Sequence, residues 1–297
     1  MLTLRQLRYF DALARLGHFG RAADACAISQ PALSMQIRDL EARLGLPLVE
    51  RRPNGVCLTA AGRDIAERAA GVMAEVRDLT DFAKSRTIPL SGDLSLGVIP
   101  SIAPYLLPSL LPLLRQTFPE LTLNIHEAQT DTITAELLDG RLDLLLLALP
   151  IDTAAIDTLH LFDDPFLLAA PKGHNVPHPA RCLPDLLQDE QLLLLEEGHC
   201  LRDQALAVCA LRNTDRTDTF GASTLATLVQ MVANGMGFTL LPEMAVQVEG
   251  RSSDIDLVPL ADPVPSRSVG LAWRKSSPLA QDFAAFGDVV KKARKKA

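Results

Sequence analysis

The hydrophobic positions at the start of the chain repeat with the period of an α-helix. Five of them recur every third residue and predict a first helix: Leu4, Leu7, Phe10, Leu13 and Leu16. A second, short helix is expected from Arg21, where Ala22 and Ala23 are small enough to let a neighbour pack closely. Ser29 is a favoured N-cap residue and therefore predicts the start of a third helix.

The third helix has two faces of opposite character. Its buried stripe, at intervals of four, three and four residues, is expected to consist of Leu33, Ile37, Leu40 and Leu44. The opposite face carries Pro31, Ser34, Met35 and Arg38. Two helices, a short turn and a helix with a small, polar and cationic outer face are typical of a helix-turn-helix, whose last helix enters the major groove of DNA. A generic three-helix bundle would show the same stripes, so the next segment has to distinguish the two.

Residues 49–58 place Asn54-Gly55 between two short segments with apolar ends, which is a strong signal for a β-hairpin. A hairpin that follows a helix-turn-helix is typical of a wing. Arg51 and Arg52 on its first strand are placed to contact phosphate or a minor groove, although a solvated pair at a strand end has the same appearance. The residues predicted to contact DNA are Ser29, Gln30, Pro31, Ser34, Arg38, Arg51 and Arg52.

A long helix is predicted after the wing, from a Thr59 cap to about residue 85. Its apolar residues alternate at spacings of four and three, which is a heptad stripe: Ile65, Ala69, Val72, Val76, Leu79 and Ala83. Such a stripe packs either against a second copy of the helix or against the rest of its own chain. The spacing alone does not decide between these two arrangements.

Beyond Pro89 the pattern changes to alternating strands and helices. Strands are predicted at residues 93–99, 121–125, 142–148, 166–169, 192–195, 217–220, 238–241 and 268–273, and helices at residues 106–118 and 224–234. Repeated units of this length predict an α/β fold with two doubly wound lobes and a ligand site at the carboxyl ends of the strands. Ser101, Thr130, His199 and Cys200 are expected at such ends, and Arg267 is expected just before the last strand.

Residues 196–211 contain two of the five cysteines, Cys200 and Cys209, and a helix is predicted from Leu201 onward. Nine positions in a helix separate the two thiols by roughly 13 Å, whereas a disulfide needs Cα atoms within about 7 Å. If the two thiols pair, the helix between them must unwind, which would convert oxidation into a change of shape. The first helical turn is expected to favour the thiolate of Cys200. The alternative is that both cysteines are small buried hydrophobic residues.

Composition and charge separate the chain into two regions. Residues 1–90 hold 13 Lys and Arg against 10 Asp and Glu, and the remaining residues hold 16 against 26. The overall charge of −7 therefore conceals a mildly basic first region, which suits DNA binding, and an acidic second one. No signal peptide and no run of 18 apolar residues is present, so a soluble cytoplasmic protein is expected. The sparse cysteines show neither a secreted disulfide framework nor zinc-ligand spacing, so we predict no metal and no cofactor.

Two segments carry a resemblance to one known family. Residues 198–205, which read GHCLRDQA, together with Cys209, are similar to the redox segment of peroxide-sensing members of the LysR-type transcriptional regulators. Residues 21–62, including SQPALS and LTAAG, resemble the DNA-binding domain of the same family. The resemblance implies a winged helix-turn-helix over residues 1–60 and a dimerisation helix over residues 61–87. It also implies a two-lobed, periplasmic-binding-protein-like effector domain, with residues 88–163 and 268–297 in one lobe and 164–267 in the other.

The resemblance also implies the roles of individual residues. Cys200 would be the peroxidatic cysteine and Cys209 the resolving one, while Ser101 and Thr130 would position the peroxide. Arg267 and His199 would supply charge and hydrogen bonds. Ser101 stands where the family pattern has threonine, so the hydroxyl is kept and the methyl group is lost. Ordinary helix capping is an equally simple explanation of each of the two hydroxyls taken alone.

The expected function is a transcriptional activator that responds to hydrogen peroxide and controls antioxidant genes. Its expected partners are double-stranded promoter DNA, RNA polymerase and further copies of the chain in a homodimer or homotetramer. One alternative is a LysR-type regulator whose cleft binds a small metabolite, with structural cysteines. Another is a thiol peroxidase. This interpretation is less favoured, because a peroxidase has no use for a DNA-binding region and because a sensor needs only one stoichiometric oxidation. No enzyme activity is therefore predicted.

Overall fold

The protein is described here by a computed structural model covering residues 2–52, 55–85, 90–176, 178–180, 191–208, 221–250 and 254–296. The chain divides into two compact units. The first comprises Met1–Lys84 with Leu138–Arg141, and the second Ser85–Leu137 with Leu142–Ala297. No helix among the described residues has both the length and the apolar composition that a membrane span requires.

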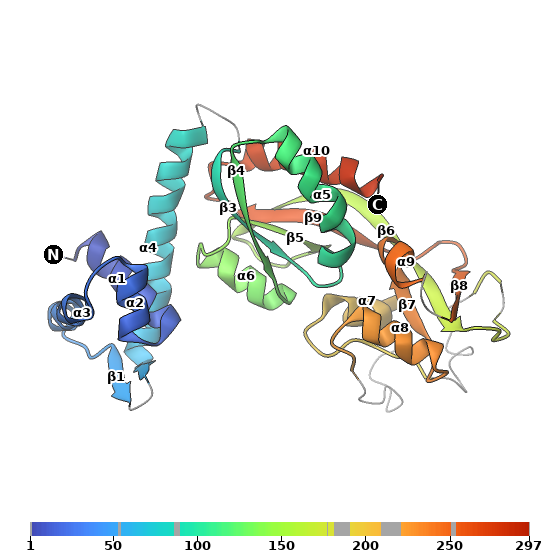
Figure 1. Cartoon of the computed structure of the whole chain (residues 1–297), viewed down its shortest axis with the longest axis horizontal. Helices are drawn as coiled ribbons and strands as arrows, with labels where there is room; N and C mark the ends of the chain where they lie inside the picture. The colour runs from blue at the N-terminus through green and yellow to red at the C-terminus, as the bar shows by residue number, and fades with distance from the viewer. Residues whose placement is uncertain are drawn as a thin grey trace. The chain divides into compact units, whose positions relative to one another are not determined.

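The first unit contains the three predicted helices, the hairpin and the long helix (Figure 1). Their bounds are α1 Leu4–Leu16, α2 Phe19–Ala25, α3 Gln30–Leu44, β1 Val49–Arg52, β2 Gly55–Leu58 and α4 Ala60–Ser85. The predicted stripes form its core, because Phe10, Leu13, Leu33, Ile37 and Leu40 are each at most 1% exposed. Helix periodicity therefore located this core correctly.

Local capping fixes where these helices begin. Ser29 caps α3 as predicted, since its hydroxyl accepts a hydrogen bond from the Ala32 N–H at 3.4 Å. Helix α2 starts earlier than the predicted Arg21, because the His18 side chain acts as the N-cap. Its Nδ1 accepts the N–H groups of Gly20 and Arg21 at 3.1 and 3.4 Å. An N-cap histidine carries a weaker sequence signal than Ser, Thr, Asp or Asn, which explains the error.

The hairpin forms, with Gly55 paired on its second strand, whereas the sequence had placed Asn54-Gly55 at its centre. Gly55 pairs with Arg52 in the antiparallel register, and Val49 pairs with Leu58. The turn between Arg52 and Gly55 falls on residues outside the described part of the chain. The Val56 N–H donates to the Gly17 carbonyl at 2.9 Å, so the hairpin is attached to the turn between α1 and α2.

Thr59 joins the hairpin to the long helix. Its hydroxyl accepts the Gly62 N–H at 2.8 Å, which confirms the predicted cap, and donates to the Pro47 carbonyl at 2.7 Å. Gly62 is required at this crossing, because an added Cβ would lie 2.0 Å from the Leu48 carbonyl oxygen. The start of α4 is therefore held against the chain that precedes the hairpin.

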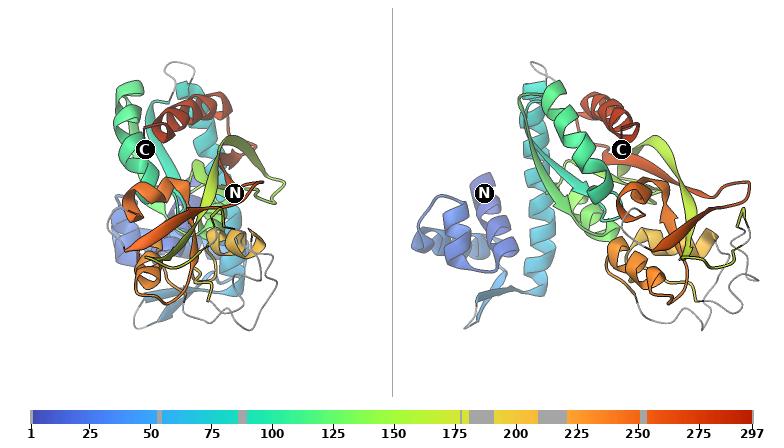
Figure 2. Two further views of the ribbon diagram at one scale, coloured as in Figure 1. Left: turned by 90° about the vertical axis from the view of Figure 1, so that its right-hand side faces the viewer. Right: turned by 45° about the vertical axis from the view of Figure 1, so that its right-hand side comes forward.

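The second unit is an α/β structure with two lobes that share long strands (Figures 1 and 2). Its first lobe is built from β3 Gly92–Val98, α5 Ala103–Thr117, β4 Leu121–Glu127, α6 Thr130–Leu138, β5 Leu144–Leu149 and α10 Ala280–Arg294. Its second lobe contains α7 Cys200–Val208, α8 Leu225–Ala233, β7 Thr239–Pro242, α9 Glu243–Glu249 and β8 Ile255–Pro259. Strands β6 Ile156–Pro171 and β9 Ser266–Arg274 connect the two.

The sheet order is β4-β3-β5-β9-β6-β7, with β8 paired to β6. Strand β3 is parallel to β4 and β5, whereas β9 is antiparallel to both β5 and β6. The first part of β6 pairs with β9, and its last part pairs with β7 and β8. Helices α5 and α10 lie side by side against this sheet in both figures. One strand therefore carries the backbone from the first lobe into the second.

Several predicted elements of this unit need correction. Residues 192–195 form isolated bridges at Leu192 and Leu195 and no strand, because each end pairs with a different segment. The prediction at residues 166–169 found only the apolar end of β6, since its first part alternates with exposed polar residues that hide the strand. The predicted strand at residues 217–220 lies outside the described residues. The continuous run near residue 145 is β5, whose buried residues confirm a strand covered on both faces.

Candidate functional site

Four chain segments bring the predicted redox residues together at the boundary between the lobes. Ser101 lies in the turn between β3 and α5, and Thr130 is the first residue of α6. Cys200 is the first residue of α7, directly after His199. Arg267 is the second residue of β9, whereas the sequence placed it before that strand. Thr130 and Cys200 were expected at the ends of strands, but each is the first residue of a helix.

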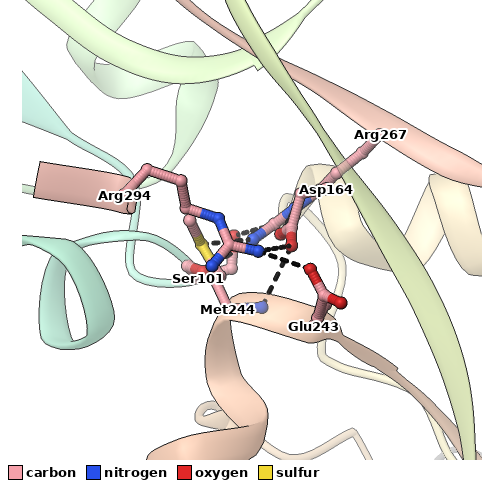
Figure 3. Close-up of polar contacts among 6 residues, drawn as sticks. All are labelled: Ser101, Asp164, Glu243, Met244, Arg267 and Arg294. Atoms are coloured by element: carbon pink, nitrogen blue, oxygen red, sulfur yellow. Dashed lines mark hydrogen bonds and ion pairs between the residues drawn. The ribbon is translucent and has the colours of Figure 1, made fainter. Parts of the chain in front are cut away.

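Arg267 is the centre of this site and is only 2% exposed (Figure 3). Its Nε donates to Asp164 Oδ2 at 3.0 Å, and Nη1 donates to Ser101 Oγ at 2.8 Å. Nη2 donates to the Ser101 carbonyl at 2.9 Å and to the Met244 sulfur at 3.1 Å. A guanidinium has five N–H groups. Among the described residues one N–H, on Nη1, therefore has no assigned acceptor.

Asp164 balances the charge of Arg267 and is fully buried, with a side-chain exposure of 0%. Its Oδ1 also accepts the Met244 N–H at 3.0 Å, at the start of α9. The guanidinium of Arg294 lies 3.7 Å from Asp164 and donates to Glu243 at 2.6 Å. The cluster thus joins the turn after β3, both connecting strands, α9 and α10 (Figure 3).

Burial raises the pKa of the Cys200 thiol above its ordinary value. The Thr130 hydroxyl, the positive charge of Arg267 and the Leu201 N–H act in the opposite direction, and Asp203 adds to the increase. Loss of water contact outweighs the helix terminus here. The sequence-based expectation of a thiolate favoured in the resting protein is therefore wrong, because that expectation had no information on burial.

The Thr130 hydroxyl faces the thiol closely enough to lower its pKa, although the pair does not reach ordinary hydrogen-bond geometry. The Oγ1 atom is buried and has no other hydrogen-bond partner among the described residues. A buried hydroxyl without a partner carries a desolvation cost of about 1–3 kcal/mol. A small polar molecule beside Cys200 would remove that cost by bonding to the hydroxyl.

His199 is buried, with 8% of its surface exposed. Burial lowers the pKa of its imidazole, and the charge of Glu196 opposes that effect only in part. The ring is therefore neutral at neutral pH. It offers a hydrogen-bond donor and an acceptor, so of the two residues expected to supply charge and hydrogen bonds, Arg267 is the one that carries the charge.

The other cysteines divide between the two regions. Cys26, Cys57 and Cys200 are free thiols in the structure. Cys182 and Cys209 lie outside the described residues, so the position of the predicted resolving cysteine is not part of this description. Among the described residues no group of three or more His, Cys, Asp or Glu side chains is arranged to hold a metal ion.

The DNA-binding candidates on and just before α3 lie on the side of that helix that faces away from the core. Ser29, Gln30, Pro31 and Arg38 are exposed, and Ser34 is half-buried beside them, while the opposite side of α3 is buried. Arg38 Nε donates back to the Ser34 carbonyl at 3.3 Å, which holds the guanidinium along the helix surface. Arg51 and Arg52 lie on β1, as expected, but their side chains are outside the described part of the structure.

Comparison with known proteins matches both units to one family. The description "Bacterial regulatory helix-turn-helix protein, lysR family" covers residues 4–63, and "LysR substrate binding domain" covers residues 88–295. The regulator OxyR of Escherichia coli K12 is 43% identical over 98% of this chain and 95% of its own length. The chain belongs to the OxyR group of the LysR family.

Relatives and solved structures of this group are similar over nearly the whole chain. The "hydrogen peroxide-inducible genes activator" of Pectobacterium carotovorum is 41% identical over 98% of this chain and 96% of its own. A full-length OxyR variant from Pseudomonas aeruginosa superposes with a TM-score of 0.82 at 37% identity, covering 98% and 95% of the two chains. An H2O2-bound OxyR variant from Corynebacterium glutamicum gives a TM-score of 0.69 at 34% identity, covering 99% and 93%. The predicted family, fold class and two-lobed arrangement are thereby confirmed.

Sequence reasoning missed Asp164, Met244, Glu243 and Arg294, although they hold Arg267 in place. Asp164 had one detectable signal, since it is a charged residue just before an apolar strand segment. Arg294 and Glu243 lie far from it in sequence and look like ordinary charged helix residues. Their contribution depends on packing between distant segments, which no local pattern reveals.

Proposed function

We propose that this LysR-family regulator senses hydrogen peroxide through Cys200 and transmits the oxidation to its DNA-binding unit. The observation that carries the proposal is the position of the thiol, between the unpaired hydroxyl of Thr130 and the buried charge of Arg267. The names of the relatives, which describe hydrogen peroxide-inducible activators, support the same signal. Antioxidant genes are the targets that such a signal would control.

The first proposed step is attack of the Cys200 sulfur on one oxygen of the peroxide. An S–O bond forms, the O–O bond breaks, and the second oxygen leaves as hydroxide, which takes the thiol proton and becomes water. Cys200 is oxidised to a sulfenic acid and the peroxide is reduced. Thr130 and the remaining N–H of Arg267 are suited to hold the peroxide and to stabilise the departing oxygen. Ser101 would act by orienting Arg267, and the neutral His199 by hydrogen bonding.

The second proposed step joins the Cys200 sulfur to Cys209, with loss of the sulfenic oxygen as water. Helix α7 is described from Cys200 to Val208, and Cys209 would follow as the tenth position of the segment. Continued as a helix, the segment would hold the two thiols roughly 13 Å apart. Disulfide formation would then require α7 to unwind, and that change of shape is the proposed output of the sensor.

Assembly and DNA contact complete the proposal. Along α4, Val72 is 40% exposed and Leu79 is 71% exposed, so part of the heptad stripe is available to a second copy of the chain. We assign residues 1–60 to DNA contact, 61–87 to dimerisation and the rest to two effector lobes, divided as the sequence suggested. A homotetramer on promoter DNA that contacts RNA polymerase in the cytoplasm would use all these parts. Stoichiometric oxidation without turnover separates this role from that of an enzyme.

Promoter transcription in vitro tests the proposal. Purified full-length protein is assayed with RNA polymerase and a candidate promoter, before and after a slight excess of hydrogen peroxide. We expect activation by peroxide in the natural protein and none in Cys200→Ser. Cys26→Ser is the matched control, because it removes a free thiol of the first unit, and it should respond as the natural protein does. A peroxide response that persists in Cys200→Ser would overturn the proposal.

Peptide mapping by mass spectrometry under non-reducing conditions tests the second step. The expected product of peroxide treatment is a Cys200–Cys209 disulfide, accompanied by new protease cleavage between Leu201 and Val208. In Cys209→Ser the sulfenic acid should still form, but the altered cleavage should not persist. A different dominant disulfide, or an unchanged protease pattern in the oxidised protein, would refute the unwinding step.

A further inference from the structure

A pocket of about 250 Å³ lies between the two lobes next to the redox residues. From the first lobe it is lined by Ser101, Tyr105 and Glu127, among others. From the second lobe it is lined by His199, Ala226 and Glu249, among others. The mechanism proposed above uses only two of its lining residues, Ser101 and His199. The rest of the pocket has no assigned role.

The pocket and the redox site have two residues in common, Ser101 and His199. Ser101 accepts the hydrogen bond from Arg267, whose charge acts on Cys200, and His199 immediately precedes Cys200 in the chain. The thiol itself is partly buried, and the Thr130 hydroxyl beside it is fully withdrawn from solvent. A small solute that reaches the pocket is therefore already in contact with two residues of the redox site.

The charged groups on the pocket wall are both carboxylates. Glu127 is exposed at the end of β4, and Glu249 is half-buried at the end of α9. The Tyr105 hydroxyl donates to Glu249 at 2.9 Å across the two lobes. Burial and this bond raise the pKa of Tyr105 well above its ordinary value, so the hydroxyl stays protonated and keeps donating. The Glu249 carboxylate is thereby fixed on the pocket wall.

Positive charge does not offset these carboxylates on the described part of the wall. No Lys or Arg is among the described residues that line the pocket. His199 is neutral, because burial lowers the pKa of its ring. Arg267 lies behind Ser101 and its charge reaches Tyr105 in the wall, but the buried Asp164 at 3.0 Å offsets part of that charge, and the wall itself carries two carboxylates. The potential in the pocket should therefore be negative.

We propose that this pocket is the passage by which peroxide reaches Cys200, and that Glu127 and Glu249 make it select neutral peroxides over anionic ones. The inference rests on the proposed function, in that Cys200 is taken as the reacting thiol. Hydrogen peroxide carries no charge at neutral pH and passes two carboxylates without repulsion. An anionic peroxide is repelled over a range of about 10 Å at 0.1 M salt, so its concentration near the thiol is reduced.

Peroxymonosulfate is a suitable anionic probe, because it oxidises a thiol by the same kind of step. The sulfur bonds to the outer peroxide oxygen, the O–O bond breaks, sulfate leaves and the thiol proton passes to water, which yields the same sulfenic acid as hydrogen peroxide does. Full-length protein is treated with either oxidant and quenched with an alkylating reagent. The loss of free Cys200 thiol is then followed by mass spectrometry. The measured quantity is the ratio of the peroxymonosulfate rate to the hydrogen peroxide rate.

The variants Glu127→Gln and Glu249→Gln remove one negative charge each and preserve shape, and the amide oxygen introduced by Glu249→Gln still accepts the Tyr105 hydroxyl. We expect the double variant to raise the rate ratio by about three- to tenfold at low salt, and added salt to reduce the difference. Glu120→Gln is the matched control, since Glu120 precedes β4 at the opposite end of the strand from Glu127 and should leave the ratio unchanged. An unchanged ratio in the double variant would overturn the charge selection.

A second pair of variants tests the passage itself. Ala226→Phe places a ring on the pocket wall near the start of α8 and should slow oxidation of Cys200 by hydrogen peroxide severalfold. Ala284→Phe, on the exposed side of α10, adds the same ring away from the pocket and should leave the rate unchanged. An unchanged rate in Ala226→Phe would overturn the passage. Failure of the natural protein to lose Cys200 thiol with hydrogen peroxide would refute the proposed function instead.

Discussion

Replacement of Asp164 by Asn is a direct test of how the redox site is held together. Asp164 and Arg267 are both 0% exposed at the side chain, and Nε and Oδ2 are 3.0 Å apart. Removing one partner of a buried ion pair typically costs about 3–5 kcal/mol, because the other charge is left without compensation. The Asn amide would also point an N–H group at a donor, either Arg267 Nε or the Met244 N–H. We expect Asp164→Asn to lower the free energy of unfolding by about 4 kcal/mol.

Two comparisons separate the pair from its surroundings. Arg294→Gln removes a guanidinium that lies 3.7 Å from Asp164 and is 21% exposed, so it should cost at most about 1 kcal/mol. Arg267→Met leaves Asp164 uncompensated and should cost about as much as Asp164→Asn. The double variant removes both charges. It should be at least about 2 kcal/mol more stable than the sum of the two single effects predicts, because neither charge is then left unpaired.

Urea unfolding followed by fluorescence provides the assay. Trp273 is the single tryptophan of the chain, is 8% exposed, and lies on β9, the strand that carries Arg267. Its emission therefore reports on the second unit without interference from the first. A loss below about 1 kcal/mol for Asp164→Asn, or additive effects in the double variant, would refute the reasoning, because the pair would then be dispensable or uncoupled.

Three further predictions concern DNA contact, assembly and pH. Arg38→Ala should weaken binding to operator DNA by about 1–3 kcal/mol if Arg38 contacts a base. Titrations on operator and on scrambled DNA test this, and an affinity that the substitution leaves unchanged on both would remove Arg38 from the interface. Leu79→Glu should dissociate the assembly, as measured by light scattering, because it places a charge in the heptad stripe. Glu67→Ala, on the face of α4 opposite the stripe, should leave the assembly intact. An intact assembly in Leu79→Glu would show that the stripe does not lie between subunits. Because the pKa of Cys200 is raised, its alkylation rate should reach half its maximum at a pH above the ordinary thiol pKa. The free energy of unfolding should also fall as the pH rises from the ordinary pKa through the raised one, since the thiol of the unfolded chain loses its proton first. A half-maximum below the ordinary value, in alkylation measured across pH, would contradict this.

The sequence alone was sufficient for the first unit because its helices are specified locally. The apolar stripe of α3 and the Ser29 cap each depend on residues within one or two turns of each other, and the structure confirms both. The pairing of Gly55 within the hairpin and the start of α2 were the details that the local pattern did not predict. Val56 bonds to Gly17, and His18 replaces the expected kind of cap.

In the second unit the sequence identified which residues belong to the candidate site but not how they act. The motif around Cys200 and the resemblance it carries named Ser101, Thr130, His199 and Arg267 as neighbours. Of these, Arg267 bonds to Ser101, and both Thr130 and Arg267 act on the thiol. Only tertiary packing set their protonation. Burial raises the pKa of Cys200, which reverses the expected preference for its thiolate, and lowers the pKa of His199, which leaves a neutral hydrogen-bonding ring.

The supporting cluster was decided entirely by the tertiary structure. Asp164 on β6 meets Arg267 on β9 because the two strands pair in an antiparallel register, and α9 and α10 bring Met244 and Arg294 to the same point. Asp164 lies 80 positions from Met244, 103 from Arg267 and 130 from Arg294, so local periodicity contains no record of these contacts. Sequence patterns record the faces that each element buries against its neighbours. Which charges meet inside the protein depends on how distant elements are packed, and that packing sets the chemistry of the site.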